Sequence, residues 1–282
     1  MFIINNTILH QLSEQGVVKI QMMSYIIELP SDHVIVIDGG NKVDTMYLLD
    51  YLKHLCKVKP VIDAWFLTHA HSDHIDAFME IIKKHSDEVI IKSILYNFPD
   101  SSFVEKYEPS EAHTIHEFDS LYPKFSSIAK QVKEGDLYTF SGVIFKVLYT
   151  PDPTFTNNAI NNSSIVLRME AEGQSVLFLA DLGIEAGNKL LTRLNINELH
   201  ADFVQMAHHG QSGVTRELYK AINPSVCLWS TPQWLWDNDA GKGYNTHTWQ
   251  TVIVRQWMKD LGVRQHFVTK DGTAKIELPM QI

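Results

Sequence analysis

Six consecutive residues of this chain hold four side chains that can bind a metal ion. His69, His71, Asp73 and His74 directly follow the apolar run Val61–Leu67, which is typical of a buried strand. Residues two apart in an extended backbone point the same way, so His69 and His71 can bind one ion while Asp73 and His74, past the turn, reach a second. Imidazole and carboxylate suit Zn, Mn or Fe, and no nearby thiolate indicates a purely structural zinc. The segment therefore predicts a catalytic metal centre, in which a bound ion brings the pKa of water to about 7.

The string Thr68-His69-Ala70-His71-Ser72-Asp73-His74 resembles the H-x-H-x-D-H signature of the metallo-β-lactamase superfamily. Three more segments resemble that family: residues 34–40, which end in Asp38-Gly39-Gly40, residues 175–181, which end in Asp181, and residues 203–212, which contain His208-His209-Gly210. The resemblance implies a four-layer αββα sandwich and two divalent ions, with zinc the first candidate and manganese or iron the others. It also implies that Asp181 bridges the ions and that His208, in preference to His209, is the last histidine ligand.

The order of Asn161-Asn162, Asp181 and His208-His209-Gly210 is similar to that in the nuclease domain of ComEC-type DNA-uptake proteins and their free-standing relatives. The chain departs from that group at Gln21-Met22-Met23-Ser24, where a Gly-Gln-Gly-Asp turn is usual, and at Thr246-His247-Thr248, where a His-Pro pair is usual.

Residues 154–162 also lack the histidine that most two-metal members carry before the bridging aspartate. We expect a side-chain oxygen of Asn161 or Asn162 to replace it. The alternatives are His113 or His116, from an insertion at 97–132, or no replacement at all, the asparagine-rich run being a loop of turn-forming residues.

Other polar residues have expected roles around this centre. Asp38 should orient a ligand histidine, because metal-bound imidazoles usually donate their other N–H to such a group; a turn aspartate before two glycines is the alternative. Asp73, His209 and His247 are candidate catalytic groups, with His247 as general acid or phosphate donor, or else an exposed histidine before a helix. Substrate contacts are expected from a polar, aromatic-rich loop and its surroundings, whose rings can stack a base or hold a cation, or simply pack the loop on the body: Asn161, Asn162, Ser212, Trp234 and Tyr244.

Composition limits the classes of partner. With 282 residues, 45% of them hydrophobic, the chain can bury one large core or two packed halves, and we expect a single domain over 1–282. A formal charge of −9 opposes binding of duplex nucleic acid, which needs a basic face. Neither a signal peptide nor a run of roughly 18 apolar residues is visible, so we expect a cytoplasmic protein without membrane contact. Cys56 and Cys227 are expected as buried thiols rather than a disulfide, and an oligomer is left open.

The coarse pattern of elements agrees with two packed sheets. Two pseudo-repeat halves, about 1–134 and 135–282, are expected, and the insertion at 97–132 could be a lid over the cleft or a dimer contact. Strands are predicted at 17–29, 33–37, 61–67 and 89–96, hairpins at 137–148 and 164–179, and helices at 44–58, 75–85, 216–222 and 249–261.

These residues predict a dinuclear metal-dependent hydrolase. A metal-bound hydroxide would attack the phosphorus of a small or short phosphoester, with a phosphodiester the preferred substrate, and His247 or His209 would assist the leaving oxygen. Three alternatives use the same ligands: a lactone or acyl-ester hydrolase, a di-iron redox protein, and a decayed, non-catalytic metal-binding module. Fold and ligands alone do not decide among substrates.

Overall fold

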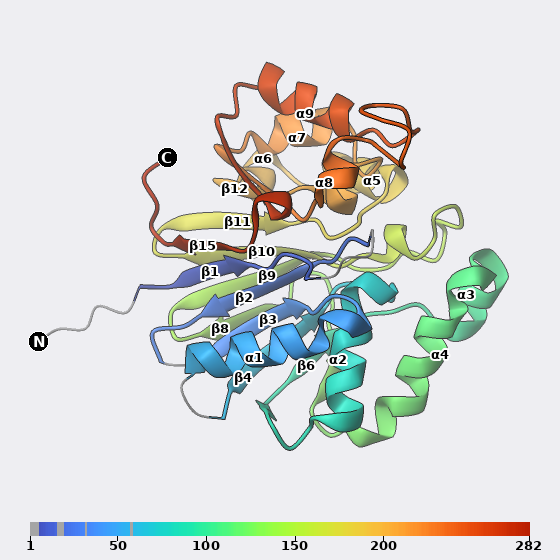
Figure 1. Cartoon of the computed structure of the whole chain (residues 1–282), viewed down its shortest axis with the longest axis vertical. Coiled ribbons are helices and arrows are strands. Elements are labelled where there is room, and N and C mark those ends of the chain that lie inside the picture. Colours follow the sequence, from blue (N-terminus) through green and yellow to red (C-terminus); the bar gives the residue numbers. More distant parts are fainter. Residues whose placement is uncertain (1–5, 16–19, 32, 57–58) are drawn as a thin grey trace, which may run out of the picture.

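Two β-sheets packed face to face, with helices on their outer faces, form the frame that carries the site (Figure 1). The computed structural model describes residues 6–15, 20–31, 33–56 and 59–282. Three buried clusters separate the layers, one between the sheets and one between each sheet and its helices. The prediction of a four-layer αββα sandwich is confirmed.

The first sheet has the strand order β15-β1-β2-β3-β4-β6-β7, with β5 beside β4. Strands β15, β1, β2 and β3 are antiparallel to one another, whereas β3, β4, β6 and β7 are parallel. Because β15 comes from the end of the chain, the two halves of the sequence do not map one to one onto the sheets. The strands are β1 (Ile8–Gln11), β2 (Ser24–Glu28), β3 (Val34–Asp38), β4 (Val61–Leu67), β5 (Ile90–Ile91), β6 (Ile94–Tyr96), β7 (Ala129–Gln131) and β15 (Ala274–Glu277).

The second sheet repeats this pattern in the order β14-β13-β12-β11-β10-β9-β8. Strands β8 to β11 are antiparallel and β11 to β14 are parallel. The carboxyl ends of β4 in one sheet, and of β11 and β12 in the other, lead into the segments that were predicted to hold metal. Strand β3 ends at Asp38, which was predicted to orient a ligand histidine. The strands are β8 (Leu137–Phe140), β9 (Val143–Tyr149), β10 (Val166–Ala171), β11 (Gln174–Phe178), β12 (Phe203–Gln205), β13 (Val226–Trp229) and β14 (Gln265–Val268).

Helices cover the outer face of each sheet. On the first sheet lie α1 (Thr45–Cys56), α2 (Ser72–Lys84), α3 (Ser101–Tyr107) and α4 (Ala112–Leu121), and on the second α5 (Ile184–Arg193), α6 (Ile196–Leu199), α7 (Arg216–Ile222), α8 (Gln233–Trp236) and α9 (Thr251–Asp260). Short 3-10 turns are η1 (Lys42–Asp44), η2 (Pro109–Glu111), η3 (Tyr122–Lys124), η4 (Asn161–Ser163), η5 (Ala207–Gly210) and η6 (Thr269–Asp271). Within the described residues, every helix is too short or too polar to cross a membrane.

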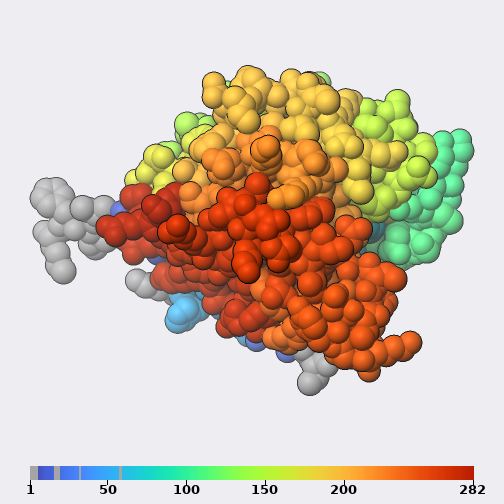
Figure 2. Space-filling model, turned by 90° about the horizontal axis from the view of Figure 1, so that it is seen from above, coloured from blue at the N-terminus to red at the C-terminus, as the bar shows by residue number. Residues whose placement is uncertain are grey.

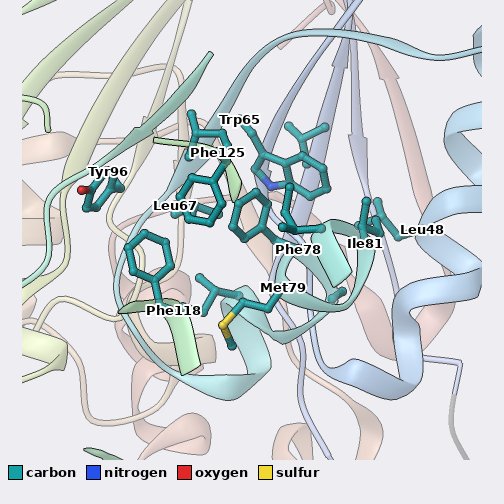
Figure 3. Packing of buried hydrophobic residues seen from close by; sticks show 14 of the residues in the cluster. Leu48, Trp65, Leu67, Phe78, Met79, Ile81, Tyr96, Phe118 and Phe125 are labelled. Atoms are coloured by element: carbon teal, nitrogen blue, oxygen red, sulfur yellow. The ribbon is translucent and has the colours of Figure 1, made fainter. Parts of the chain in front are cut away.

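The central strands are buried on both faces, which explains their continuous apolar runs. In β3, Val36 packs against the helices and Ile37 packs between the sheets. Trp65 of β4 meets Phe78 of α2 edge to face with ring centroids 5.1 Å apart, and Figure 3 shows the surrounding rings. Aromatic pairs of this kind contribute about 0.5–1.5 kcal/mol beyond area burial. This packing holds α2 against β4.

Several element boundaries differ from those expected. The predicted strand at 17–29 is only β2 (Ser24–Glu28), and its residues 17–19 lie outside the described residues. The run at 89–96 is divided into β5 and β6, and β1 was missed because four residues carry too little periodicity. The insertion forms α3, α4 and β7, and its Phe118 and Phe125 pack in the cluster that contains Phe78. The two hairpins and α7 agree with prediction.

Candidate metal centre

The first half of the site is built where β4 runs into α2. His71 is the extended N-cap residue of α2, and Asp73 and His74 lie in its first turn, so the helix begins earlier than the predicted residue 75. The backbone N–H of Gly39 donates to the carbonyl of His74 at 2.7 Å. At Gly40, with φ +89°, a Cβ would lie 2.7 Å from Met22 Cε. The positive φ of Gly40 therefore favours glycine where the end of β3 supports this turn.

The second half is built where β11 and β12 end. Asp181 follows β11, and η5 follows β12 with two consecutive left-handed residues, His208 (φ 52°) and His209 (φ 55°). Such backbone costs of order 1–3 kcal/mol per residue unless it is supported. Support comes from Ser230, whose carbonyl oxygen lies 2.8 Å from His209 Nδ1, and from Thr231 Oγ1, which donates to the His209 carbonyl at 2.6 Å. These bonds leave His209 Nε2 to point into the site.

The two halves bring six side chains together as two groups of three. His69, His71 and Asp181 form one group, and Asp73, His74 and His209 form the other; within each group the ligand atoms lie within 4.8 Å of one another.

Asp181 lies between the two groups. Its Oδ1 is 3.3 Å from His74 Nε2, and its Oδ2 is 3.3 Å from His209 Nε2 and 3.9 Å from His69 Nε2. One carboxylate oxygen therefore faces His74 while the other faces His69 and His209. Asp181 therefore contacts residues of both groups, and its role as a bridging ligand stays a prediction.

The chemistry of these atoms fits two divalent ions. His74 Nε2, Asp181 Oδ1 and His209 Nε2 are buried without a hydrogen bond, which costs free energy in a folded protein unless another partner is supplied. Imidazole nitrogens and carboxylate oxygens are suitable ligands for zinc, manganese or iron. The residues present can therefore hold the ions that the sequence predicts.

The charges of the groups are strongly coupled. Burial opposes the charged form of His209, but the carboxylates of Asp181 and Asp73 outweigh it and raise the pKa of His209 to about 10. Burial alone would raise the pKa of Asp181, yet His209 and His74 hold that pKa well below its usual value. Burial and the neighbouring His74 lower the pKa of His69, which keeps this ring neutral and able to bind a metal.

The structure favours the other of the two adjacent histidines as the ligand. His209 is 1% exposed and lies in the group with Asp73 and His74, whereas the side chain of His208 is 23% exposed with its Nε2 3.9 Å from Asp181. We expected His208 to be the ligand because it comes first after the strand. The left-handed backbone at both residues instead turns the second ring inward and leaves the first at the wall of the cavity.

A cavity of about 430 Å³ opens onto these groups. Its wall includes Glu108 and Glu111, two residues of the insertion at 97–132 that were not predicted to be neighbours of the ligands. No sequence signal placed them there, because their position depends on how α3 and α4 pack beside α2 (Figure 1). The other residues that line the cavity are Ile20, Gln21, Asn41, His71, Ser72, Asp73, Ser110, Asp181 and His208.

Comparison with known proteins agrees with this geometry. The sequence model of the metallo-β-lactamase superfamily matches residues 20–226. The chain belongs to the metallo-β-lactamase superfamily. One curated relative, ComE operon protein 3 of Bacillus subtilis (strain 168), is 29% identical over 171 residues, which cover 59% of this chain and 20% of that protein. The chain thus corresponds to about a fifth of the length of that relative.

Solved structures with a metallo-β-lactamase or similar fold match most of this chain. The metallo-β-lactamase fold protein YhfI from Bacillus subtilis gives a TM-score of 0.53 at 13% identity and covers 96% of this chain and 100% of its own. A variant of the CmlA β-hydroxylase gives 0.56 at 12% identity, covering 96% and 54%. Zinc-bound PqqB from Methylobacterium extorquens gives 0.52 at 10% identity, covering 92% and 88%. At these identities the likeness shows the fold alone.

The two histidines of the insertion do not replace the histidine that is missing from 154–162. His116 Nε2 is 2.7 Å from Glu105 Oε1, and His113 Nδ1 is 3.2 Å from the Ser110 carbonyl, both on the exposed surface. Neither belongs to the two ligand groups found among the described residues.

The two asparagines differ in what their side-chain oxygens do. Asn162 Oδ1 accepts a hydrogen bond at 3.1 Å from the N–H of Ala186 in α5, so it stabilises the start of that helix. Asn161 Oδ1 is buried without a hydrogen bond. We therefore still predict that Asn161 supplies an oxygen ligand to the group of His69, His71 and Asp181. We no longer predict this of Asn162.

The predicted substrate loop lies apart from the ligand groups. His247 is exposed and stacks on Trp249 with ring centroids 3.7 Å apart, and Trp234 packs on the same ring at 5.0 Å. Tyr244 lines a different cavity, and Ser212 is exposed. Among the described residues that line the 430 Å³ cavity, none of these four appears. These contacts fit the alternative that the rings pack the loop on the body of the protein. Catalysis by His247 remains a prediction that none of these contacts supports.

Asp38 occupies the position expected of a residue that orients a ligand. Its Oδ2 lies 2.7 Å from His74 Nδ1, and Thr68 donates to both of its oxygens, from N–H and Oγ1, at 2.7 Å. Burial raises the pKa of Asp38. These contacts leave His74 Nε2 facing Asp181.

We expect Asp38→Asn to weaken metal binding by about 10- to 100-fold, the usual effect of losing such an orienting carboxylate. Asparagine tolerates the left-handed backbone at this position, φ 55°, so the loss would not come from backbone strain. Competition with a chromophoric chelator measures the affinity. An unchanged affinity would show that Asp38 does not orient His74.

Metal binding should release protons. Because the pKa of His209 is raised to about 10, this ring is protonated at neutral pH before an ion binds, and it must lose that proton to become a ligand. The affinity should therefore rise with pH below about 10, by about tenfold per unit for each proton released. Calorimetric titrations at pH 7 and pH 8, in buffers of different ionisation enthalpy, measure both the affinity and the released protons. An affinity independent of pH would contradict this expectation.

Proposed function

We propose that this chain is a dinuclear metal-dependent hydrolase of phosphodiesters. The observation that carries the proposal is the position of Asp181, buried between two groups of imidazole and carboxylate ligands at the wall of a cavity of about 430 Å³. A site with two ligand groups sharing one carboxylate suits a reaction in which both the attacking and the leaving oxygen need stabilisation.

Each ligand residue has a defined part in this proposal. His69, His71 and Asp181 would hold one ion, and Asp73, His74 and His209, with Asp181 shared, would hold the other. When bound, the ions would lower the pKa of a coordinated water and offset negative charge on the phosphate oxygens. Asp38 keeps the proton of His74 on Nδ1, and the Ser230 carbonyl does the same for His209, so that each Nε2 is free to bind.

His208 takes the substrate-contacting part that the sequence assigned to its neighbour. Its ring lines the cavity, and its Nε2 lies 3.9 Å from Asp181. Burial lowers the pKa of His208, so the neutral ring can donate a hydrogen bond to a substrate oxygen or accept one from the attacking water. No side-chain nucleophile is needed in this reaction.

The resemblance to ComEC-type nuclease domains supports phosphodiester chemistry, and the formal charge of −9 favours a small or short substrate over duplex DNA. One observation favours a second candidate, an acyl-ester or lactone hydrolase. Among the described residues that line the cavity there is no lysine or arginine to bind a phosphate. A neutral ester would not need one.

The test begins with metal content. Purified protein incubated with zinc or manganese is expected to retain two ions per chain by mass spectrometry and to hydrolyse bis(p-nitrophenyl) phosphate. Hydrolysis of an aryl lactone alone would favour the second candidate. Iron as the retained metal without any hydrolysis would favour the redox alternative, and fewer than one ion per chain would favour a non-catalytic module.

A further inference from the structure

A second cavity, of about 440 Å³, lies beside α9 on the helix-covered side of the second sheet. Figure 2 shows the molecule from the side on which α9 lies, where the orange and red segments form most of the surface. Among the described residues, this cavity shares no lining residue with the cavity at the metal centre. Its lining residues are Trp229, Trp236, Tyr244, Val252, Arg255, Gln256, Lys259, Val263 and His266.

The fully charged side chains in this lining are both cations, Arg255 and Lys259 of α9. None of the described lining residues is an aspartate or a glutamate, and within the described part of the chain neither cation forms a salt bridge. Asp32 is the one acidic residue outside that part, and its neighbour Ser31 contacts Ser141 in the turn between β8 and β9 at 3.0 Å. The cavity therefore has a positive wall that attracts anions.

The carboxylates closest to this wall in the sequence have other partners. Asp260, which follows Lys259, lies 3.2 Å from Arg216 through Oδ2 and accepts a hydrogen bond from Gln256 through Oδ1 at 2.7 Å. Asp237, which follows α8, accepts a hydrogen bond from Gln233 at 2.6 Å. These contacts leave the two cations of the cavity for a ligand.

The guanidinium of Arg255 is held in one orientation. Its central carbon lies 4.0 Å from the centroid of the Trp236 ring, and its Nη1 donates to the Trp236 carbonyl at 3.0 Å. A guanidinium carries five N–H donors in a planar fork that matches a phosphate group. Because the fork is already fixed by Trp236, binding a phosphate would cost little further side-chain entropy.

The inner wall of the cavity is neutral. Trp229 is fully buried, and its Nε1 donates to His266 Nδ1 at 3.1 Å. Burial lowers the pKa of His266, which keeps the imidazole uncharged. The positive charge is thus confined to the side of the cavity that α9 forms.

Tyr244 adds an exposed aromatic ring to the same cavity. Its side chain is 61% exposed, and within the described residues no other ring stacks on it. The loop that carries it is braced, because the N–H of Gly243 donates to Asp239 Oδ1 and the N–H of Asn245 donates to the Asp237 carbonyl, both at 2.8 Å. An exposed ring on a fixed loop can stack a planar ligand.

We propose that this cavity binds a phosphate monoester that carries a planar ring, such as a nucleoside monophosphate. Arg255 and Lys259 would bind the phosphate, and the base would stack on Tyr244. Its volume of about 440 Å³ lies in the range of small-molecule sites, roughly 300–1,000 Å³. None of the metal-ligand groups found among the described residues lines it, so the nucleotide would be a ligand and not a substrate. The inference is independent of the proposed function.

Calorimetric titration of the full-length protein with AMP, adenosine and inorganic phosphate tests the inference. AMP should bind at least about tenfold more tightly than either fragment, because only AMP offers both the charge and the ring. Arg255→Gln should weaken AMP binding by at least about tenfold, and Lys259→Gln, at an exposed position, by up to about fivefold. Tyr244→Ala should weaken it by about tenfold and Tyr244→Phe should not, since the ring is what stacks. Lys220→Gln, on the exposed face of α7 and outside the lining, is the matched control and should bind AMP as the wild type does.

One further variant separates this cavity from the metal centre. Asp181→Asn, which is expected to lose metal ions, should still bind AMP with the wild-type affinity. Loss of AMP binding in Asp181→Asn, with no effect of Lys259→Gln or Tyr244→Ala, would place the nucleotide at the metal centre and overturn the inference. AMP binding no tighter than that of adenosine or of phosphate would also overturn it. Both results would leave the proposed hydrolase function standing.

Discussion

Replacing Asp181 by asparagine is expected to abolish measurable hydrolysis and to reduce the number of ions that the chain retains. Asp181 is the residue whose two oxygens face both ligand groups, at 3.3 Å from His74 and His209 and 3.9 Å from His69. Asparagine keeps the size of the side chain and removes the charge that would be shared between two cations. The loss in kcat/KM should exceed the roughly 10- to 100-fold effect of an outer carboxylate such as Asp38.

Metal content by mass spectrometry and kcat/KM on an aryl phosphodiester together measure the effect of Asp181→Asn. Asp50→Asn, a change of the same kind on the exposed face of α1, is the matched control and should retain both properties. In the metal-free variant the pKa of His74 and of His209 should fall, since Asp181 is the first carboxylate that raises each of them against burial. Retention of two ions with full activity would show that Asp181 does not bridge.

Substitution by asparagine should have different effects at His208 and at His209. His209→Asn is expected to reduce the bound metal from two ions to one, because asparagine is too short to reach the group with Asp73 and His74. His208→Asn should retain both ions and lose activity through weaker contact with the substrate. Asparagine suits the pair because both residues have φ above 50°, a backbone that asparagine tolerates better than alanine.

Mass spectrometry of the metal content and kcat/KM separate the two roles. A stability change of similar size in both variants would not alter the comparison, since the readout is the number of ions per folded chain. If His208→Asn lost an ion and His209→Asn kept both, the preference for His208 that follows from its place in the sequence would be restored.

Much of the fold was predictable because its signals are local. Residues 61–67 have the continuous apolar run of a strand buried on both faces, and β4 has those bounds. Ser141-Gly142 and Glu172-Gly173 predict two hairpins, and both pairs of strands form with positive φ at these four residues. By contrast, β1 and β5 are four and two residues long. Strands of that length are decided by the neighbour they pair with, not by their own periodicity.

The candidate site, like the fold, was predictable only where its signals are local. The sequence by itself determined the chemical types of the ligands and the local spacing that gathers His69, His71, Asp73 and His74, because these depend only on consecutive residues at one strand end. Its preference for His208 over His209 rested only on which residue comes first after the strand. That choice depends on a backbone turn at η5, where a Cβ on Gly210 would lie 2.4 Å from the Trp229 ring, and on the Ser230 carbonyl that orients His209.

The remaining parts of the site were decided by tertiary structure alone. Asn162 looked like a ligand in the sequence, but the start of α5 lies against it and takes its oxygen as a hydrogen-bond acceptor. Glu108 looked like one acidic residue among several in an insertion, and the packing of α3 and α4 beside α2 brings it to the cavity, where Ile160 fixes it. Ligand types and their local spacing are properties of short segments. The direction of a ring, the free oxygen of an amide and the charge at a cavity mouth depend on contacts between residues far apart in the chain.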